Sequence, residues 1–166
     1  NNHCFNLTNT SAPGADSRGI MLAGLPDTNS TFTVTGNKVR DATRGINIEV
    51  DTGDTAFVCN NTVQGVYDYG ILLTSGGIWT HVEGNFFEGR SIIGVIAISA
   101  AGANVGEVYI GPNGKGAMTY SSAPVADLLV FDFGTMPTLT IEGLVNWKAN
   151  FTTLPTIMKI RNCSLL

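Results

Sequence analysis

Apolar and polar residues alternate along most of the first hundred residues, and a short polar turn interrupts the alternation at a fixed interval. Three segments share one pattern: apolar, any residue, Gly or Asn, Asn, any residue, apolar. They are Val34–Val39, Val58–Val63 and Val82–Phe87. The Asn at the fourth position of the pattern stands at positions 37, 61 and 85, which are evenly spaced. Alternation with period 2 predicts β-strands, and a repeat of this length predicts a solenoid.

A second repeated feature has almost the same spacing as the Asn motif, and we call the two features anchors. Gly45, Gly70 and Gly94 each open a short apolar run, and one follows another at nearly the interval of the Asn motif. Gly and Thr are too dense, and the apolar period too short, for helices in this part of the chain. We therefore predict an all-β chain that winds as a parallel β-helix with about 24 residues per coil.

The repeat loosens after Ser99 without disappearing. Gly or Asn markers stand at positions 36, 60, 84, 111, 143 and 162, evenly spaced at first and unevenly from the third marker onward. This predicts regular coils over residues 1–113, and over 114–166 a less regular continuation or a C-terminal, trimerisation region. The chain opens and closes within a repeat, so we expect a piece of a longer protein or a processed product.

The alternation assigns each residue of a coil to one face. If Ile46 and Ile48 point inward, every second residue between and beyond them points out. The outward column would then contain Asn47 and three large apolar residues, Met21, Leu72 and Ile96. An apolar outer strip usually marks an interface, so Met21, Leu72 and Ile96 are predicted to form an oligomer contact. The alternative is that a loop or a later segment covers them. The repeated Asn is predicted to stack along the axis and to bond turn backbone groups.

Composition narrows the classes of function. Only 13% of the 166 residues are charged, 43% are hydrophobic, and the net charge is −4. Nucleic-acid binding needs a basic face, and no apolar run reaches the ~18 residues of a membrane span, so neither partner is expected. Cys4, Cys59 and Cys163 show no CxxC pair and no Cys/His metal spacing, and are predicted to be small buried apolar residues. We expect no metal and no cofactor, and we expect His81 to be packed or hydrogen-bonded.

The coil motifs resemble the right-handed parallel β-helix of the pectate-lyase-like superfamily. The resemblance rests on Gly36-Asn37, Asn60-Asn61 and Gly84-Asn85, together with the Gly45, Gly70 and Gly94 anchors, and covers about residues 1–113 well. Within the superfamily, the low charge, the long Thr-, Ser- and Asn-rich loops, the apolar outer column and the irregular final third look most like a phage tailspike. Such proteins are homotrimers that bind bacterial surface polysaccharide and often cleave it. The resemblance thus implies a carbohydrate partner, a homotrimer and a place on a virion tail or outside the cell.

Charged residues gather between the two anchors, in residues 38–44, 62–69 and 86–93. Glycoside cleavage uses two carboxylates about 5–5.5 Å apart for retention or 6.5–9.5 Å for inversion, which neighbouring rungs can supply. The candidate catalytic residues are Asp68, Glu88 and Asp41. Aromatic rings, planar guanidinium groups and amides suit sugar contacts. The candidate carbohydrate-binding residues are Arg44, Tyr67, Tyr69, Gln64 and Arg90.

Alternatives to this site remain open. The same residues could simply form an ordinary solvated turn face in which Arg and Asp side chains pair. A lyase would instead use a base such as Arg or Tyr, and Arg44 could serve as that base. If the chain is an enzyme, it is a polysaccharide depolymerase, hydrolase or lyase. The rival functions are a monomeric pectate-lyase-like lyase or glycosidase fragment, and a structural or adhesive stalk without catalysis.

Overall fold

The computed structural model describes residues 3–4, 18–24, 29–51, 53–75, 77–91, 93–120 and 126–166. These ranges contain strands and no helix, so they hold no helix that could cross a membrane. Every strand pair in them is parallel, including those in the N-terminal coils. The predicted all-β parallel solenoid is therefore confirmed.

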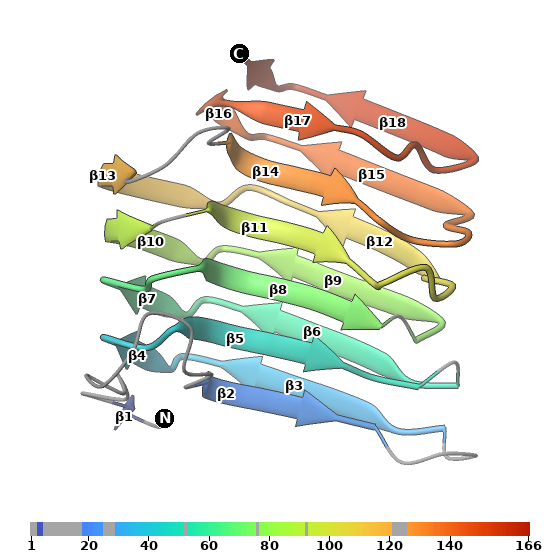
Figure 1. Cartoon of the computed structure of the whole chain (residues 1–166), viewed down its shortest axis with the longest axis horizontal. Coiled ribbons are helices and arrows are strands. Elements are labelled where there is room, and N and C mark those ends of the chain that lie inside the picture. The colour runs from blue at the N-terminus through green and yellow to red at the C-terminus, as the bar shows by residue number, and fades with distance from the viewer. Residues whose placement is uncertain are drawn as a thin grey trace.

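Three parallel sheets form the walls of the solenoid (Figure 1). In the order of their neighbours, sheet A contains β1 (His3–Cys4), β4 (Lys38–Arg40), β7 (Thr62–Gln64), β10 (Phe86–Ser91) and β13 (Gly114–Tyr120). Sheet B contains β2 (Arg18–Ala23), β5 (Arg44–Glu49), β8 (Tyr69–Ser75), β11 (Gly94–Ser99), β14 (Ala126–Phe131) and β17 (Ala149–Phe151). Sheet C contains β3 (Thr31–Thr35), β6 (Thr55–Cys59), β9 (Trp79–Glu83), β12 (Glu107–Ile110), β15 (Thr138–Glu142) and β18 (Ile157–Arg161).

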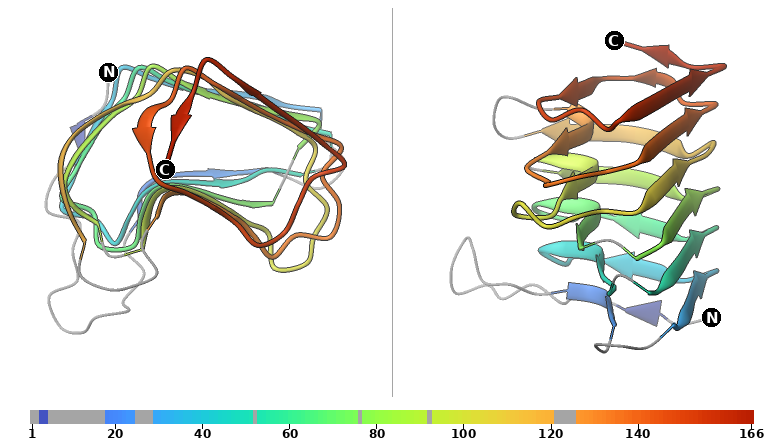
Figure 2. Two further views of the ribbon diagram at one scale, coloured as in Figure 1. Left: turned by 90° about the horizontal axis from the view of Figure 1, so that it is seen from above. Right: turned by 90° about the vertical axis from the view of Figure 1, so that its right-hand side faces the viewer.

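The chain makes about five turns, each running from sheet A through B to C. In Figure 1 the strands of sheet B run to the right in front and those of sheet C run to the left behind, while the chain rises toward its C-terminus. This sense is right-handed, as parallel crossover connections nearly always are. Seen along the axis, sheet C is straight and the outer side of sheet B is concave (Figure 2).

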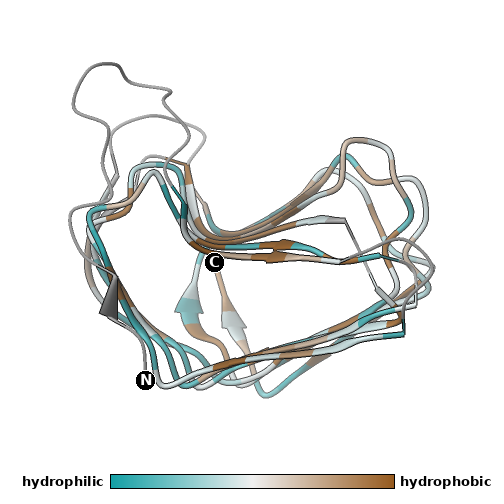
Figure 3. Ribbon diagram, turned by 90° about the horizontal axis from the view of Figure 1, so that it is seen from below, coloured by the Kyte–Doolittle hydropathy of each residue, from teal (hydrophilic) through white to brown (hydrophobic). Residues whose placement is uncertain are grey.

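Alternate residues of the strands fill one continuous core. Figure 3 shows hydrophobic and hydrophilic positions interspersed along the strands that enclose it. Val34, Val58 and Val82 stack inward from sheet C, while Val39, Val63 and Phe87 do so from sheet A. Sheet B adds Ile46, Ile71 and Ile96, followed by Ile48, Leu73 and Ile98. Inward positions are apolar in nearly every rung because each lies between equivalent residues of the coils before and after it.

A ladder of asparagines marks the corner between sheets C and A, as predicted. Asn37 donates from its side-chain nitrogen to Asn61 Oδ1 (3.0 Å), Asn61 to Asn85 Oδ1 (2.9 Å), and Asn85 to Asn113 Oδ1 (3.0 Å). Each oxygen also accepts the backbone N–H of the preceding Asn. Burying amides is favourable here because their polar atoms find partners on neighbouring rungs.

The ladder ends where the residue type changes. Leu144 occupies the equivalent position of the next coil and is fully buried. One coil later the position belongs to Cys163, whose thiol lies 3.0 Å from the carbonyl oxygen of Arg161. The residue before this position takes a positive φ at Gly36, Asn60, Gly84, Gly143 and Asn162, a conformation that Gly and Asn adopt most readily.

The predicted outer column on sheet B needs one correction. Ile96 pairs with Ile71 and lies in the core, so the expectation that it points outward is wrong. Ala97 takes its place beside Leu72, because Gly94 pairs with Tyr69 and not with Gly70. The two glycine anchors are therefore offset by one residue, and in a strand an offset of one residue exchanges the faces.

The corrected column forms a small second apolar cluster of Leu72, Ala97, Ala126 and Leu129, against which Tyr69, Ile93 and Phe131 pack. Leu72 is only 4% exposed in the single chain, whereas Met21 at the end of the column is 43% exposed. This burial favours the alternative in which the chain itself covers the column. The oligomer contact through Met21 and Leu72 stays a prediction.

The solenoid changes shape toward its C-terminal end. Sheets B and C continue, but sheet A ends at β13, and a two-stranded sheet D of β16 (Val145–Trp147) and β19 (Ser164–Leu165) follows. Figure 2 shows these strands inside the outline of the earlier coils. Trp147 is 1% exposed and packs edge-on against Phe87, with ring centroids 6.3 Å apart. Lys115 lies 5.8 Å from the Trp147 ring and pairs with the buried carboxylate of Asp127.

Candidate functional site

The outer face of sheet C gathers aromatic side chains from three successive coils. Register pairs Phe57 of β6 with His81 of β9, and His81 with Tyr109 of β12. Trp79 lies two residues before His81 and therefore on the same face. The residues between them, including Val58, Thr80 and Val82, are buried. We call Phe57, Trp79, His81 and Tyr109 the ring stack. Strand alternation places all four side chains on the outer face of the sheet.

The rings of the stack contact one another. Their centroids are 5.2 Å apart for Phe57 and Trp79, 5.1 Å for Trp79 and His81, and 4.6 Å for His81 and Tyr109. Edge-to-face contacts are preferred arrangements for aromatic pairs. All four side chains are partly exposed, so the stack presents apolar rings to the outside.

Carboxylates border the ring stack at the C-terminal ends of the strands. Glu83 Oε1 lies 3.2 Å from His81 Nε2, and the Tyr109 hydroxyl donates to Glu142 Oε2 at 3.4 Å. Gly111 lies between the two glutamates. A side chain would not fit there, because a Cβ would lie only 2.9 Å from Glu83 Oε2. Partial desolvation, and then the charges of Glu142 and Glu83, raise the pKa of Tyr109 above its ordinary value. The phenol therefore remains a hydrogen-bond donor across neutral pH.

A pocket of about 650 Å³ adjoins the other end of the stack. Its walls come from the connections between sheets B and C in three successive coils and from the first residues of β9 and β12. The lining residues are Gly77, Ile78, Trp79, Asn104, Val105, Gly106, Glu107, Thr135 and Pro137. Trp79 lines the pocket and belongs to the ring stack, so the two form one continuous surface. Glu107 adds a carboxylate to the wall and Ile78, which is 59% exposed, an apolar edge.

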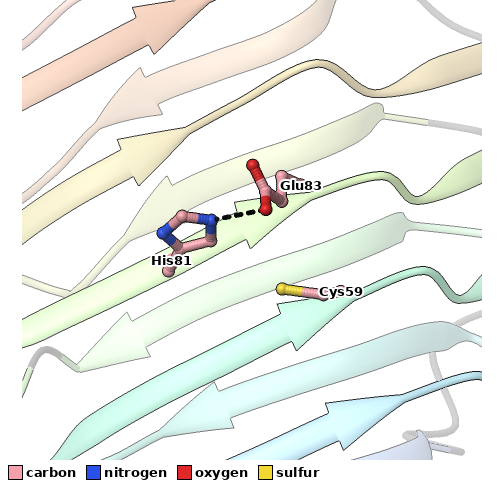
Figure 4. Close-up of side chains that lie close together, drawn as sticks. All are labelled: Cys59, His81 and Glu83. Carbon is pink, nitrogen blue, oxygen red and sulfur yellow. Dashed lines mark ion pairs between the residues drawn. The ribbon is translucent and has the colours of Figure 1, made fainter.

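Cys59 also faces outward on this sheet, beside Glu83 (Figure 4). The prediction that it is a buried apolar residue is wrong, because Val58 takes the inward position of the strand. Partial burial raises the pKa of the Cys59 thiol; the backbone N–H of Glu83 lowers it and the Glu83 carboxylate raises it. His81 is packed and paired, as the sequence predicts. Cys163 packs against the core, and the Cys4 side chain lies outside the described residues.

The residues predicted for catalysis lie elsewhere, on sheet A and at its corner with sheet B. Register places Glu88 beside Gln64, whose side-chain amide donates to the Glu88 carboxylate, and Gln64 beside Arg40. Asp68 lies at the corner, where its carbonyl oxygen accepts the backbone N–H groups of Ile93 and Gly94. The rung neighbour of Glu88 is therefore Gln64 and not Asp68.

Asp41 occupies a turn position with φ 54°, equivalent to Gly65 and Gly89 in the next coils. Asp tolerates this left-handed conformation better than most residues. The turn conformation alone is therefore enough to explain why an Asp occurs at position 41.

The predicted sugar-binding residues divide between these regions. Gln64 is on sheet A, while Arg44 and Tyr69 pair at the start of β5 and β8. Burial and then Asp68 raise the pKa of Tyr69, and Arg44 opposes the shift. Tyr67 is half-buried at the same corner, and the side chain of Arg90 lies outside the described residues. Whether any of them binds sugar or acts in catalysis stays a prediction.

Sequence reasoning missed the ring stack although its signal was present. One period of the coil leads from Phe57 to His81, from Cys59 to Glu83 and from Thr55 to Trp79, and these are the observed partners. The step from His81 to Tyr109 is longer because a longer connection precedes β12, and the fixed period does not predict it.

Comparison with known proteins gives no assignment: no family model, no curated protein and no solved structure matches the chain.

Proposed function

We propose that the protein is a polysaccharide-binding β-helix of the tailspike type, and that the ring stack on sheet C, with the adjoining pocket, is its sugar-binding surface. The observation that carries the proposal is the continuous row of four partly exposed rings across three coils. Aromatic rings pack against the apolar faces of sugars, and a row of rings on successive coils can contact successive units of a polymer. The β-helix fold itself is compatible with a polysaccharide-binding stalk.

The charges on this face indicate the class of polysaccharide. Glu83, Glu107 and Glu142 border the rings and the pocket, and their carboxylates accept hydrogen bonds from sugar hydroxyls. These three carboxylates outnumber the cations Lys159 and Arg161 of β18 on the same face, so they would repel a polymer of uronic acids. The preferred ligand is therefore a neutral polysaccharide. The resemblance to tailspikes further leads us to propose a homotrimer on a virion tail, whose assembly the native mass from light scattering would test.

Trp79 offers a direct test of sugar binding. Trp147, the other tryptophan of the chain, is buried, so a change in tryptophan emission on adding polysaccharide reports on Trp79. A panel of neutral and uronic-acid polysaccharides should contain a neutral member that changes the emission and binds in calorimetry. Trp79→Ala should weaken that binding at least tenfold, about 1.4 kcal/mol.

The matched control is Phe86→Ala, which removes a ring that is 41% exposed on the outer face of sheet A. It should leave binding unchanged. Equal losses from the two substitutions, or binding only of uronic-acid polymers, would contradict the assignment to sheet C.

A further inference from the structure

Three side chains of metal-ligating type converge at the C-terminal ends of β6 and β9. One ligand atom each from Cys59, His81 and Glu83 lies within 4.8 Å of the others. Figure 4 shows the Cys59 sulfur, the Glu83 carboxylate and one edge of the His81 ring turned toward a common space. The three residues come from two neighbouring coils, so up to a full coil of sequence separates them.

Two regular features of the solenoid bring these side chains together. Parallel register sets Cys59 directly beside Glu83 on the next rung, about 4.8 Å away along the axis. His81 precedes Glu83 by two residues in β9 and so projects from the same face of the sheet. The arrangement therefore depends on backbone pairing in the regular part of the fold.

The packing around His81 limits how its imidazole can turn. The ring lies between Trp79 and Tyr109, with centroid distances of 5.1 and 4.6 Å. Its Nε2 faces Glu83 at 3.2 Å, while Nδ1 is buried and has no hydrogen-bond partner. The imidazole is 17% exposed and the Glu83 side chain 43% exposed, so an ion from solvent can reach the cluster.

The donor set selects the kind of ion. A thiolate, an imidazole and a carboxylate are the ligand types of zinc sites, whereas calcium and magnesium take oxygen ligands. A divalent ion would also offset the charge of Glu83, which lies beside the thiol. Three protein ligands leave one tetrahedral position for water or another ligand, the pattern of open zinc sites.

We infer that Cys59, His81 and Glu83 form a binding site for one zinc ion on the outer face of sheet C. Zinc would join two neighbouring coils through side chains, as the asparagine ladder joins them at the corner. The inference concerns the metal alone and does not depend on sugar binding.

Cobalt substitution tests the inference. The reduced chain is titrated with Co²⁺ and then with Zn²⁺ in the absence of polysaccharide. We expect one equivalent of Co²⁺ to produce the near-ultraviolet charge-transfer band of a cobalt–thiolate bond, and Zn²⁺ to abolish the band by displacement. Because zinc binds the folded state, the unfolding temperature should also rise with zinc concentration.

Single substitutions assign the ligands. Cys59→Ser should abolish the thiolate band, and His81→Gln and Glu83→Gln should each weaken zinc binding by more than the roughly 10- to 100-fold that follows loss of an outer-shell partner. Cys163→Ser is the matched control, because Cys163 is the other cysteine whose side chain is described, and it should keep both band and affinity. Circular dichroism confirms that each variant is folded. Absence of a band in the parent chain, or a band that survives Cys59→Ser, would overturn the inference.

Discussion

The outer faces of sheets C and A are built by the same coils and differ in what their side chains do. On sheet A, the Gln64 side-chain amide donates to the Glu88 carboxylate, and Asp41 occupies a left-handed turn position that Asp tolerates. On sheet C, rings stack along the axis, and carboxylates border them without covering them. An enrichment in charge therefore marked the face whose polar groups pair, while the partly exposed rings lie on the other face.

We expect the largest loss of stability from a substitution in the asparagine ladder, at the corner between sheets C and A. Asn61 bonds to Asn37 and Asn85 and to the carbonyl oxygen of Val34. Asn61→Leu would leave several of these buried groups without partners, each costing about 1–3 kcal/mol. We expect the free energy of unfolding, measured with urea, to fall by about 3 kcal/mol or more. Leu itself fits such a position, since Leu144 occupies it in a later coil.

Asn60→Gly is the control for the ladder substitution. Asn60 lies in the same turn, is exposed and has a positive φ of 57° that Gly adopts freely. Its free energy of unfolding should change by less than about 1 kcal/mol. If both variants lose stability equally, the conformation of the turn, and not the hydrogen bonds of the ladder, stabilises the contact between coils at this corner.

A matched pair of glycines compares the two faces directly. A Cβ on Gly111 of the sheet C side would lie 2.8 Å from Glu83 Cβ and from Tyr109 Cε1. On sheet A, a Cβ on Gly116 would lie 3.2 Å from Glu88 Cβ and from Phe86 Cζ. Gly111→Ala should displace Tyr109 and weaken polysaccharide binding about threefold to tenfold, equivalent to roughly 0.5–1.5 kcal/mol of aromatic contact. Calorimetry should find binding by Gly116→Ala unchanged; a larger loss from this variant would move the site to sheet A.

The sequence predicted the fold because the fold repeats. Asn37, Asn61 and Asn85 recur at the period of the coil, and their role in the turn follows from that period alone. The same period could have predicted the contacts of Cys59 with Glu83 and of Phe57 with His81. The error at Ile96 arose because Gly70 and Gly94, which each open an apolar run, stand one residue out of register. Such an offset changes which face a side chain occupies, and local sequence does not report it.

The catalytic candidates could not be tested by spacing for a related reason. Asp68 and Glu88 are separated by less than one coil of sequence, so they occupy different positions on the rung. Two carboxylates on adjacent coils are neighbours only if their separation equals the local repeat. To predict which carboxylates are neighbours, one must know the number of residues per coil for sheet A and, separately, for the corner between sheets A and B.

Tyrosine ionisation provides the smallest and last contrast between the regions. The pKa values of Tyr109, on sheet C, and Tyr69, at the corner beside sheet A, are both raised by burial and by nearby carboxylates. A raised pKa in the folded state means that folding favours the protonated phenol. The resulting stability is complete below the ordinary pKa of about 10 and is lost as pH rises through the folded value. Unfolding midpoints measured from about pH 8 to 11, a range that spans this ordinary value, should fall less steeply for Tyr109→Phe than for the parent chain. Tyr69→Phe should also reduce the slope, because burial and then the charge of Asp68 raise the pKa of that phenol although Arg44 opposes the shift, as Arg161 does at Tyr109. A slope that neither substitution changes would show that other groups cause the alkaline loss of stability.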